Sequence, residues 1–242
     1  MKNTNLCCIF LVLACFISKI EAQRSVSPYE VGIHAGTTIY LGDLTPSLPG
    51  SYKTPGLFLG VSASKKLNKF FSVRGDFSLG KIHASDSNYA KPVYRQQRNF
   101  GFKSSITEIS ASIVWNPLGE GKLFIPYLFG GVGYSFLKIS RDFSKFNPEY
   151  FNNEPSVLAG LTADIDNTPP RGIGVIPIGV GIRYSLSDRI SLSFETSYRL
   201  MSTDYLDGFS KAADPLKKDH YYTHTFGFNY SFAGLNRLAC PK

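Results

Sequence analysis

The chain has 242 residues and a formal net charge of +8, from 26 basic and 18 acidic side chains that are spread along it. Because the basic residues form no run, the composition gives no reason to expect a nucleic-acid partner. The one long apolar run, residues 6–17, is too short to span a bilayer as a helix. These features exclude a helical membrane protein but not a membrane β-barrel, whose strands each give a weak signal.

Residues 1–22 have the pattern of a secretory signal peptide. Lys2 precedes the apolar run, and the small residue Ala22 precedes the expected cleavage before Gln23. A second interpretation is a lipoprotein box at residues 12–15, which would leave Cys15 lipidated. Once the signal peptide is removed, Cys240 is the one cysteine that remains of the four in the sequence, so we expect no internal disulfide.

Eight segments then alternate between apolar and polar residues, which is the period of a β-strand. They are residues 29–41, 57–64, 71–80, 108–115, 124–136, 176–186, 190–200 and 222–232. Their apolar faces carry aromatic residues toward the ends, as the girdles of membrane barrels do. Their other faces are small and polar and contain charges. A soluble β-sandwich would instead bury the apolar faces against each other.

The links between these segments alternate in length. Residues 65–69, 116–122 and 187–189 form short links, whereas residues 42–54, 84–99, 141–171 and 203–220 form long ones. Short periplasmic turns and long extracellular loops are typical of outer-membrane barrels. We therefore expect an all-β protein: an eight-stranded antiparallel transmembrane up-and-down β-barrel over residues 23–232. Residues 233–242 follow as a periplasmic tail, and the lipid of the bacterial outer membrane surrounds the wall.

The polar strand faces bring charged residues into the expected lumen: Glu30, His34, Arg74, Asp76, Glu108, Arg183, Glu195 and Arg199. An eight-stranded barrel is just wide enough to be filled by side chains, and buried charges are costly unless paired. We expect these residues to form an ion-paired plug. The alternative is a catalytic site with His34 as base, oriented by Glu30 or Asp76. No nucleophile motif or metal-ligand spacing accompanies it, so we expect no enzyme activity, cofactor or metal.

Several stretches resemble a known family of small outer-membrane barrels, the PorG-like proteins of the type IX secretion system. The resemblance lies in residues 29–32 with 40–44, in 98–108, in 126–133 and in Thr203-Asp204-Tyr205-Leu206-Asp207, where the family usually has a further acid at the position of Gly208. It implies a non-enzymatic barrel that ties a periplasmic ring, made of a lipoprotein and a soluble partner, to the outer membrane. Alternatives are a structural or adhesin-type barrel without a secretion role and, less favoured, a barrel hydrolase.

Three of these stretches meet at the same end of the expected barrel. Counting strand directions places Asp43, Arg98, Asp204 and Asp207 on the outer rim. We expect Arg98 to form an ion pair with Asp43 or Asp204, and Asp207 to cap backbone N–H groups, so that the loops form a lid. The alternative is a set of independent turns.

Overall fold

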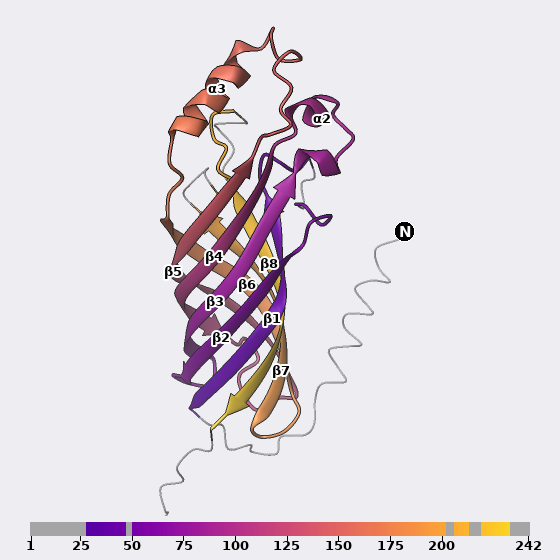
Figure 1. Ribbon diagram of the computed structural model, residues 1–242. Coiled ribbons are helices and arrows are strands. Elements are labelled where there is room, and N and C mark those ends of the chain that lie inside the picture. The colour runs from indigo at the N-terminus through magenta and orange to yellow at the C-terminus, as the bar shows by residue number, and fades with distance from the viewer. Residues whose placement is uncertain (1–27, 47–49, 202–205, 213–218, 233–242) are drawn as a thin grey trace, which may run out of the picture.

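The computed structural model describes residues 28–46, 50–201, 206–212 and 219–232, which form one closed β-barrel (Figure 1). Each strand pairs antiparallel with its sequence neighbours, and β1 closes the ring by pairing with β8. The strands are β1 (Tyr29–Leu41), β2 (Gly56–Lys66), β3 (Phe71–Ser85), β4 (Gly101–Trp115), β5 (Phe124–Asp142), β6 (Gly172–Ser185), β7 (Ile190–Met201) and β8 (His220–Ser231). The predicted eight-stranded antiparallel up-and-down barrel is confirmed.

The two ends of the barrel differ. The inner end carries the start of β1, the end of β8 and the three short turns, whereas the outer end carries the four long connections (Figure 1). The described parts of these connections contain three helical segments: η1 (Asp86–Asn88), α2 (Tyr94–Arg98) and α3 (Pro155–Asp166). The signal segment with Cys15, the tail with Cys240, and Asp204 lie outside the described residues.

The connection predicted as residues 141–171 differs from expectation in two ways. The strand before it, β5, has 19 residues and continues to Asp142, and the connection contains the 12-residue helix α3. Pro155 begins α3, where proline loses no helical hydrogen bond. No helix in the described ranges is long and apolar enough to cross a membrane.

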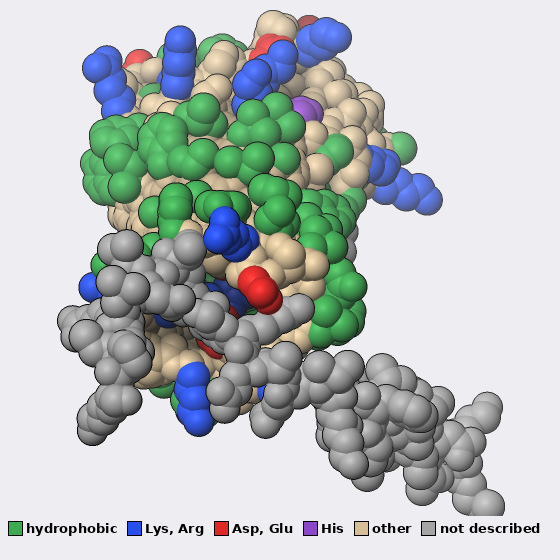
Figure 2. All heavy atoms as spheres, turned by 90° about the horizontal axis from the view of Figure 1, so that it is seen from below, with side chains coloured by type: hydrophobic (Ala, Val, Ile, Leu, Met, Phe, Trp, Pro, Cys, Tyr) green, Lys and Arg blue, Asp and Glu red, His purple; other side chains and the backbone are tan. Residues whose placement is uncertain are grey.

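A belt of exposed apolar side chains surrounds the barrel wall. Ile33, Val132 and Phe226 are 62%, 68% and 71% exposed, and Figure 2 shows hydrophobic side chains gathered along the wall. On β3 the belt runs from Phe71 to Leu79, close to the roughly 9–11 residues that a tilted strand needs to cross a bilayer. A monomer in water rarely exposes so much contiguous apolar surface, so the belt suits a lipid environment.

One residue of the predicted lipid-facing set does not belong to the belt. Ile39 is only 2% exposed, because residues 50 and 51 lie over the outer end of β1. There the Ser51 N–H donates to the Tyr40 carbonyl at 2.7 Å. Gly50 has a φ of +93°, and a Cβ at this position would lie 3.0 Å from Ile39 Cγ2. The first long connection therefore covers part of the wall.

The interior changes from polar to apolar along the barrel axis. Its inner and middle levels hold charged side chains, whereas its outer level is an apolar core shared by strands and long connections. The core comprises Tyr40, Leu44, Ile82, Ala84, Phe100, Phe102, Ile106, Leu137, Leu161, Ile173, Val175, Met201, Leu206, Phe209, Ala212 and Tyr221. Phe100 and Phe209, from two different connections, stack with their ring centroids 4.4 Å apart. This core was not predicted from the sequence.

Candidate functional site

At the inner level of the lumen, Arg183 joins two carboxylates. Its Nη1 lies 3.2 Å from Glu30 Oε1, and its Nη2 forms an ion pair with Glu120. Lys66 Nζ lies 3.1 Å from the other Glu120 oxygen. Lys66 lies two residues after the inward-facing Ser64, just beyond the predicted segment. The alternation of β2 therefore already indicated that its side chain faces the lumen. Glu120 lies in a short turn, where alternation gives no information.

At the middle level, Arg74 is the central cation. Its Nη1 lies 2.5 Å from Glu195 Oε1, and its Nε lies 3.1 Å from Asp76 Oδ2. The Tyr127 hydroxyl donates to the same Glu195 oxygen at 2.7 Å. The Arg74 guanidinium also lies over the Phe129 ring, 4.4 Å from its centroid. Charge pairing and hydrogen bonding thus offset the cost of burying two acids and one base.

At the next level outward, Arg199 faces Glu108. Arg199 Nε lies 3.6 Å from Glu108 Oε1, and the guanidinium also donates to Ser197 and Thr223. The Tyr221 hydroxyl donates to Glu108 Oε2 at 2.9 Å. The structure places all eight predicted residues in the lumen. The two on β7 form ion pairs with residues of other strands, Glu195 with Arg74 on β3 and Arg199 with Glu108 on β4.

His34 lies beside a hydroxyl group that the sequence prediction did not consider. Its Nε2 is 2.8 Å from Ser62 Oγ on the neighbouring strand. Its Nδ1 has no hydrogen-bond partner among the described residues, so neither Glu30 nor Asp76 orients the imidazole as a catalytic triad requires. The same described ranges hold no cluster of three His, Cys, Asp or Glu side chains with metal-binding geometry.

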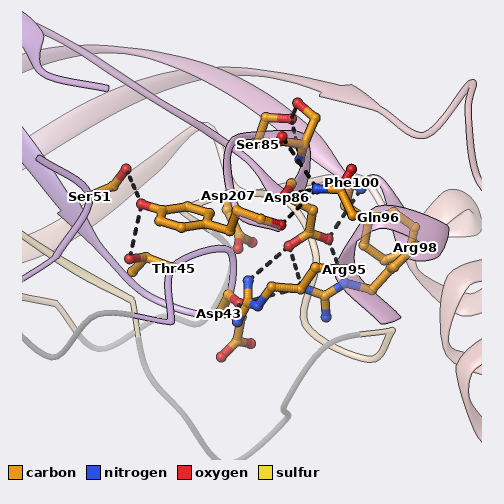
Figure 3. A network of polar contacts seen from close by, with 12 residues as sticks. Asp43, Thr45, Ser51, Ser85, Asp86, Arg95, Gln96, Arg98, Phe100 and Asp207 are labelled. Atoms are coloured by element: carbon orange, nitrogen blue, oxygen red, sulfur yellow. Dashed lines mark hydrogen bonds and ion pairs between the residues drawn. The ribbon is translucent and has the colours of Figure 1, made fainter. Parts of the chain in front are cut away.

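The described parts of the four long connections, residues 42–55, 86–100, 143–171 and 202–219, interlock above the barrel, and we call them the outer lid. Asp86 lies at its centre and is fully buried. It accepts hydrogen bonds from Arg95 Nη1 at 2.8 Å, Arg98 Nε at 2.7 Å, and the Phe100 N–H at 3.3 Å (Figure 3). Both arginines also reach the Asp43 backbone carbonyl, at 3.1 and 3.4 Å. The carboxylate thus holds both arginines, and their bonds to the Asp43 carbonyl join the second connection to the first.

The expected ion pair between Arg98 and Asp43 is therefore wrong. Arg98 pairs with Asp86, the third residue of the predicted second loop. It reaches Asp43 through the backbone carbonyl. Asp204, the other expected partner, lies outside the described residues. Asp207 does cap backbone as expected, since its Oδ1 accepts from the Phe209 N–H at 2.8 Å. Asp86 was missed because a single Asp after a strand resembles an ordinary turn residue.

A second buried cluster lies around the Tyr40 hydroxyl. The oxygen is 2.7 Å from both Asp207 Oδ2 and Asp219 Oδ1. The other Asp219 oxygen accepts from the N–H groups of Leu206 and Asp207, at 3.1 and 3.2 Å. Burial, followed by the nearby Asp207 charge, raises the pKa of Asp219 well above its ordinary range. The Tyr40 hydroxyl has one proton and can donate it to only one of the two carboxyl groups. A protonated Asp219 supplies the proton for the second hydrogen bond.

The third and fourth connections are tied together by Asp164 and Arg141. The buried Asp164 carboxylate accepts from the Lys211 N–H at 2.9 Å and from the Ala212 N–H at 2.8 Å. Arg141 donates to the carbonyls of Asp164, Asn167 and Gly208. All four connections thus contribute to one packed lid, whereas independent turns would each satisfy their own backbone.

The chain matches the model of one family over residues 5–236, which is almost its whole length. This family is described as a domain of unknown function, DUF6089. The chain belongs to the DUF6089 family. No curated protein matches it.

The DUF6089 barrel is similar to solved structures of small barrels from bacteria. Neisserial surface protein A is 15% identical, with a TM-score of 0.49 over 85% of this chain and 98% of that one. Ail, the attachment invasion locus protein of Yersinia pestis, is 12% identical, with a TM-score of 0.46 over 86% and 99%. The outer membrane protein OprG of Pseudomonas aeruginosa is 11% identical, with a TM-score of 0.46 over 87% and 99%. The evidence for the architecture of the DUF6089 barrel is its own strand pairing, which closes the sheet into a ring.

A side chain at position 208 would be strained in this structure. The φ of Gly208 is +84°, and a Cβ would lie 2.7 Å from both Cγ and Cδ of Arg141. We expect Gly208→Ala to destabilise the barrel by more than the roughly 1–2 kcal/mol that a left-handed backbone costs, because Arg141 must also move. Gly121→Ala is the matched control, since Gly121 has a φ of +87° and no neighbour within 4 Å. Equal losses in thermal unfolding would contradict the Arg141 contact.

The raised pKa of Asp219 predicts a pH dependence of the lid. The folded state holds this proton more tightly than the unfolded chain, so the stabilisation is complete below the ordinary Asp range. It is lost as pH rises through the folded pKa. We therefore expect the lid of the wild-type barrel to lose stability as the pH rises above the ordinary Asp range. Asp219→Asn, which mimics the protonated acid, should flatten this slope in melting curves of the detergent-solubilised protein. An unchanged slope would contradict the prediction.

Proposed function

We propose that the protein is an outer-membrane barrel that acts as an anchor and conducts nothing. The apolar belt and the secretory signal pattern support the location. The sealed interior is the observation that carries the role. Three levels of ion-paired side chains fill the lumen, and the apolar core of the outer lid closes the mouth above them. Such a plug would block the passage that a channel requires.

The anchored partner that the sequence motifs favour is the periplasmic ring of the type IX secretion system. The resemblance of residues 98–108 and 203–207 to the PorG-like barrels supports this role. A non-enzymatic anchor would present its inner end to the lipoprotein and the soluble protein of the ring. Figure 2 views the barrel from that end, where basic and acidic side chains appear at the inner mouth. Charged groups at this level suit a polar protein partner in the periplasm.

The decisive test is a clean deletion of the gene, complemented in trans. We expect the deletion to stop export of cargo that carries a C-terminal sorting domain, and affinity purification from detergent-solubilised membranes to recover the ring proteins. Normal export would favour a structural or adhesin-type barrel instead. In planar bilayers the wild-type barrel should show no steady conductance, and a stable open channel would contradict the anchor role.

The barrel fold has its own test in electrophoresis. A closed ring of backbone hydrogen bonds commonly resists SDS until the sample is boiled. We expect boiled and unboiled samples of the membrane fraction to migrate differently. Identical migration, together with recovery in the soluble fraction, would contradict the membrane barrel.

A further inference from the structure

Six neighbouring wall positions on β3, β4 and β5 carry only side chains that can donate hydrogen bonds. The strand register arranges them as two rows. In the first row Lys81 pairs with Ser105, which pairs with Lys138. In the second row His83 pairs with Lys103, which pairs with Ser140.

These side chains point outward from the barrel. The three lysines are exposed, while the residues beside them in sequence, among them Ile82, Phe102 and Leu137, are buried in the outer core at 2%, 3% and 7% exposure. Adjacent strands lie about 4.8 Å apart, so the Lys81 and Lys138 backbones are separated by about 10 Å. The three ammonium groups can therefore converge on one small anion.

The two rows lie directly above the apolar belt. The row below them consists of Leu79, Thr107 and Phe136, and Leu79 and Phe136 are 49% and 52% exposed. Over two residues along each strand, the outer surface of the wall therefore changes from an apolar row to a row that carries lysines. In a membrane barrel this height is the level of the lipid headgroups at the outer end.

We propose that this cationic patch, formed by Lys81, His83, Lys103 and Lys138 with Ser105 and Ser140, binds the phosphate groups of an outer-leaflet glycolipid. Phosphate offers several acceptor oxygens and a negative charge, which match lysine ammonium groups and hydroxyl donors. The inference rests on the outer-membrane location in the proposed function, but not on a role in secretion.

One acid lies at the outer edge of the patch. Asp142 lies in the next row outward, opposite Gly101. Its Oδ1 accepts from the Ser144 N–H at 3.1 Å and from the Ser144 hydroxyl at 2.8 Å. These bonds, followed by the nearby lysines, lower the pKa of Asp142, so it stays ionised. Its carboxylate is engaged by the third connection, at the far edge of the patch from the belt.

The test measures binding of lipid A to the detergent-solubilised full-length protein by native mass spectrometry. Probes are lipid A with both phosphates, its dephosphorylated form, and inorganic phosphate. We expect the diphosphorylated lipid to bind best, and K81Q/K103Q/K138Q to weaken its binding about 10- to 100-fold. Binding should also weaken as salt rises.

A matched control removes three exposed lysines from the inner end, in K65Q/K69Q/K122Q, with the same change of net charge. It should bind the lipid like the wild type. An equal loss in both triple variants, or equal binding of both lipids, would overturn the patch. Binding of inorganic phosphate as tight as that of the lipid would overturn the lipid as ligand. Heat-modifiable migration of each variant verifies the barrel itself, so a failed lipid assay is distinguishable from a failed membrane location.

Discussion

An Asp86→Ala variant is expected to lose about 3–5 kcal/mol of unfolding free energy, the usual result of removing one partner from a buried ion pair. The carboxylate is fully buried and accepts from Arg95, Arg98 and the Phe100 N–H. Without it, two guanidinium groups remain buried, and among the described residues the Asp43 carbonyl is the acceptor that they still share. Urea unfolding of the detergent-solubilised protein measures the loss, and limited proteolysis should cleave the outer lid first.

The rim supplies a matched control in Asp142→Ala. Asp142 is exposed at the same end of the barrel and accepts hydrogen bonds from Ser144. Its removal should change stability little, because an exposed charge stays hydrated. Asp86→Asn should fall between the two variants, since it keeps the side-chain shape but lacks the charge. Similar unfolding curves for Asp86→Ala and Asp142→Ala would show that the lid does not depend on the buried pair.

The sequence predicted the barrel because strand alternation reports directly on the two faces of a wall. Leu192, Phe194 and Leu200 alternate with Ser193, Glu195 and Ser197, and the structure places the first set outward and the second inward. A register error of one residue would reverse every side chain, so a consistent pattern over eight segments leaves little freedom. The same reasoning put the eight lumen residues on the inner faces.

Two kinds of feature could not be read in this way. Pairing depends on which strands lie opposite across the lumen, so alternation places Arg74 and Glu195 inside without joining them. The lid depends on packing between connections far apart in sequence, as in the stacked rings of Phe100 and Phe209. Period-two reasoning stops where the strands leave the membrane. Asp86 and helix α3 lie in that region, and both were missed.

The outer lid and the lumen network seal the barrel at separate levels, and this separation gives the anchor hypothesis a structural test. The two arginines held by Asp86 join connections above the wall, whereas Arg74 joins strands within it. Weakening the lid should therefore leave the strand network intact. A variant of the lumen should instead weaken the barrel while the lid still resists protease.

An Arg74→Met variant is the corresponding change in the lumen. It removes the cation that lies 2.5 Å from Glu195 and 3.1 Å from Asp76, and so leaves two largely buried acids at one level. We expect a loss of about 3–5 kcal/mol in unfolding free energy, less if water enters the lumen. Adding Glu195→Gln should recover part of it, because the Tyr127 hydroxyl can still donate to the amide oxygen.

The double-mutant cycle should give a coupling of roughly 0.5–3 kcal/mol, as residues in one network do. Arg189→Met, at an exposed turn of the inner end, is the control for removing an arginine. Additive losses for Arg74 and Glu195, or a loss no larger than that of Arg189→Met, would mean that the lumen is a solvated passage and not a plug.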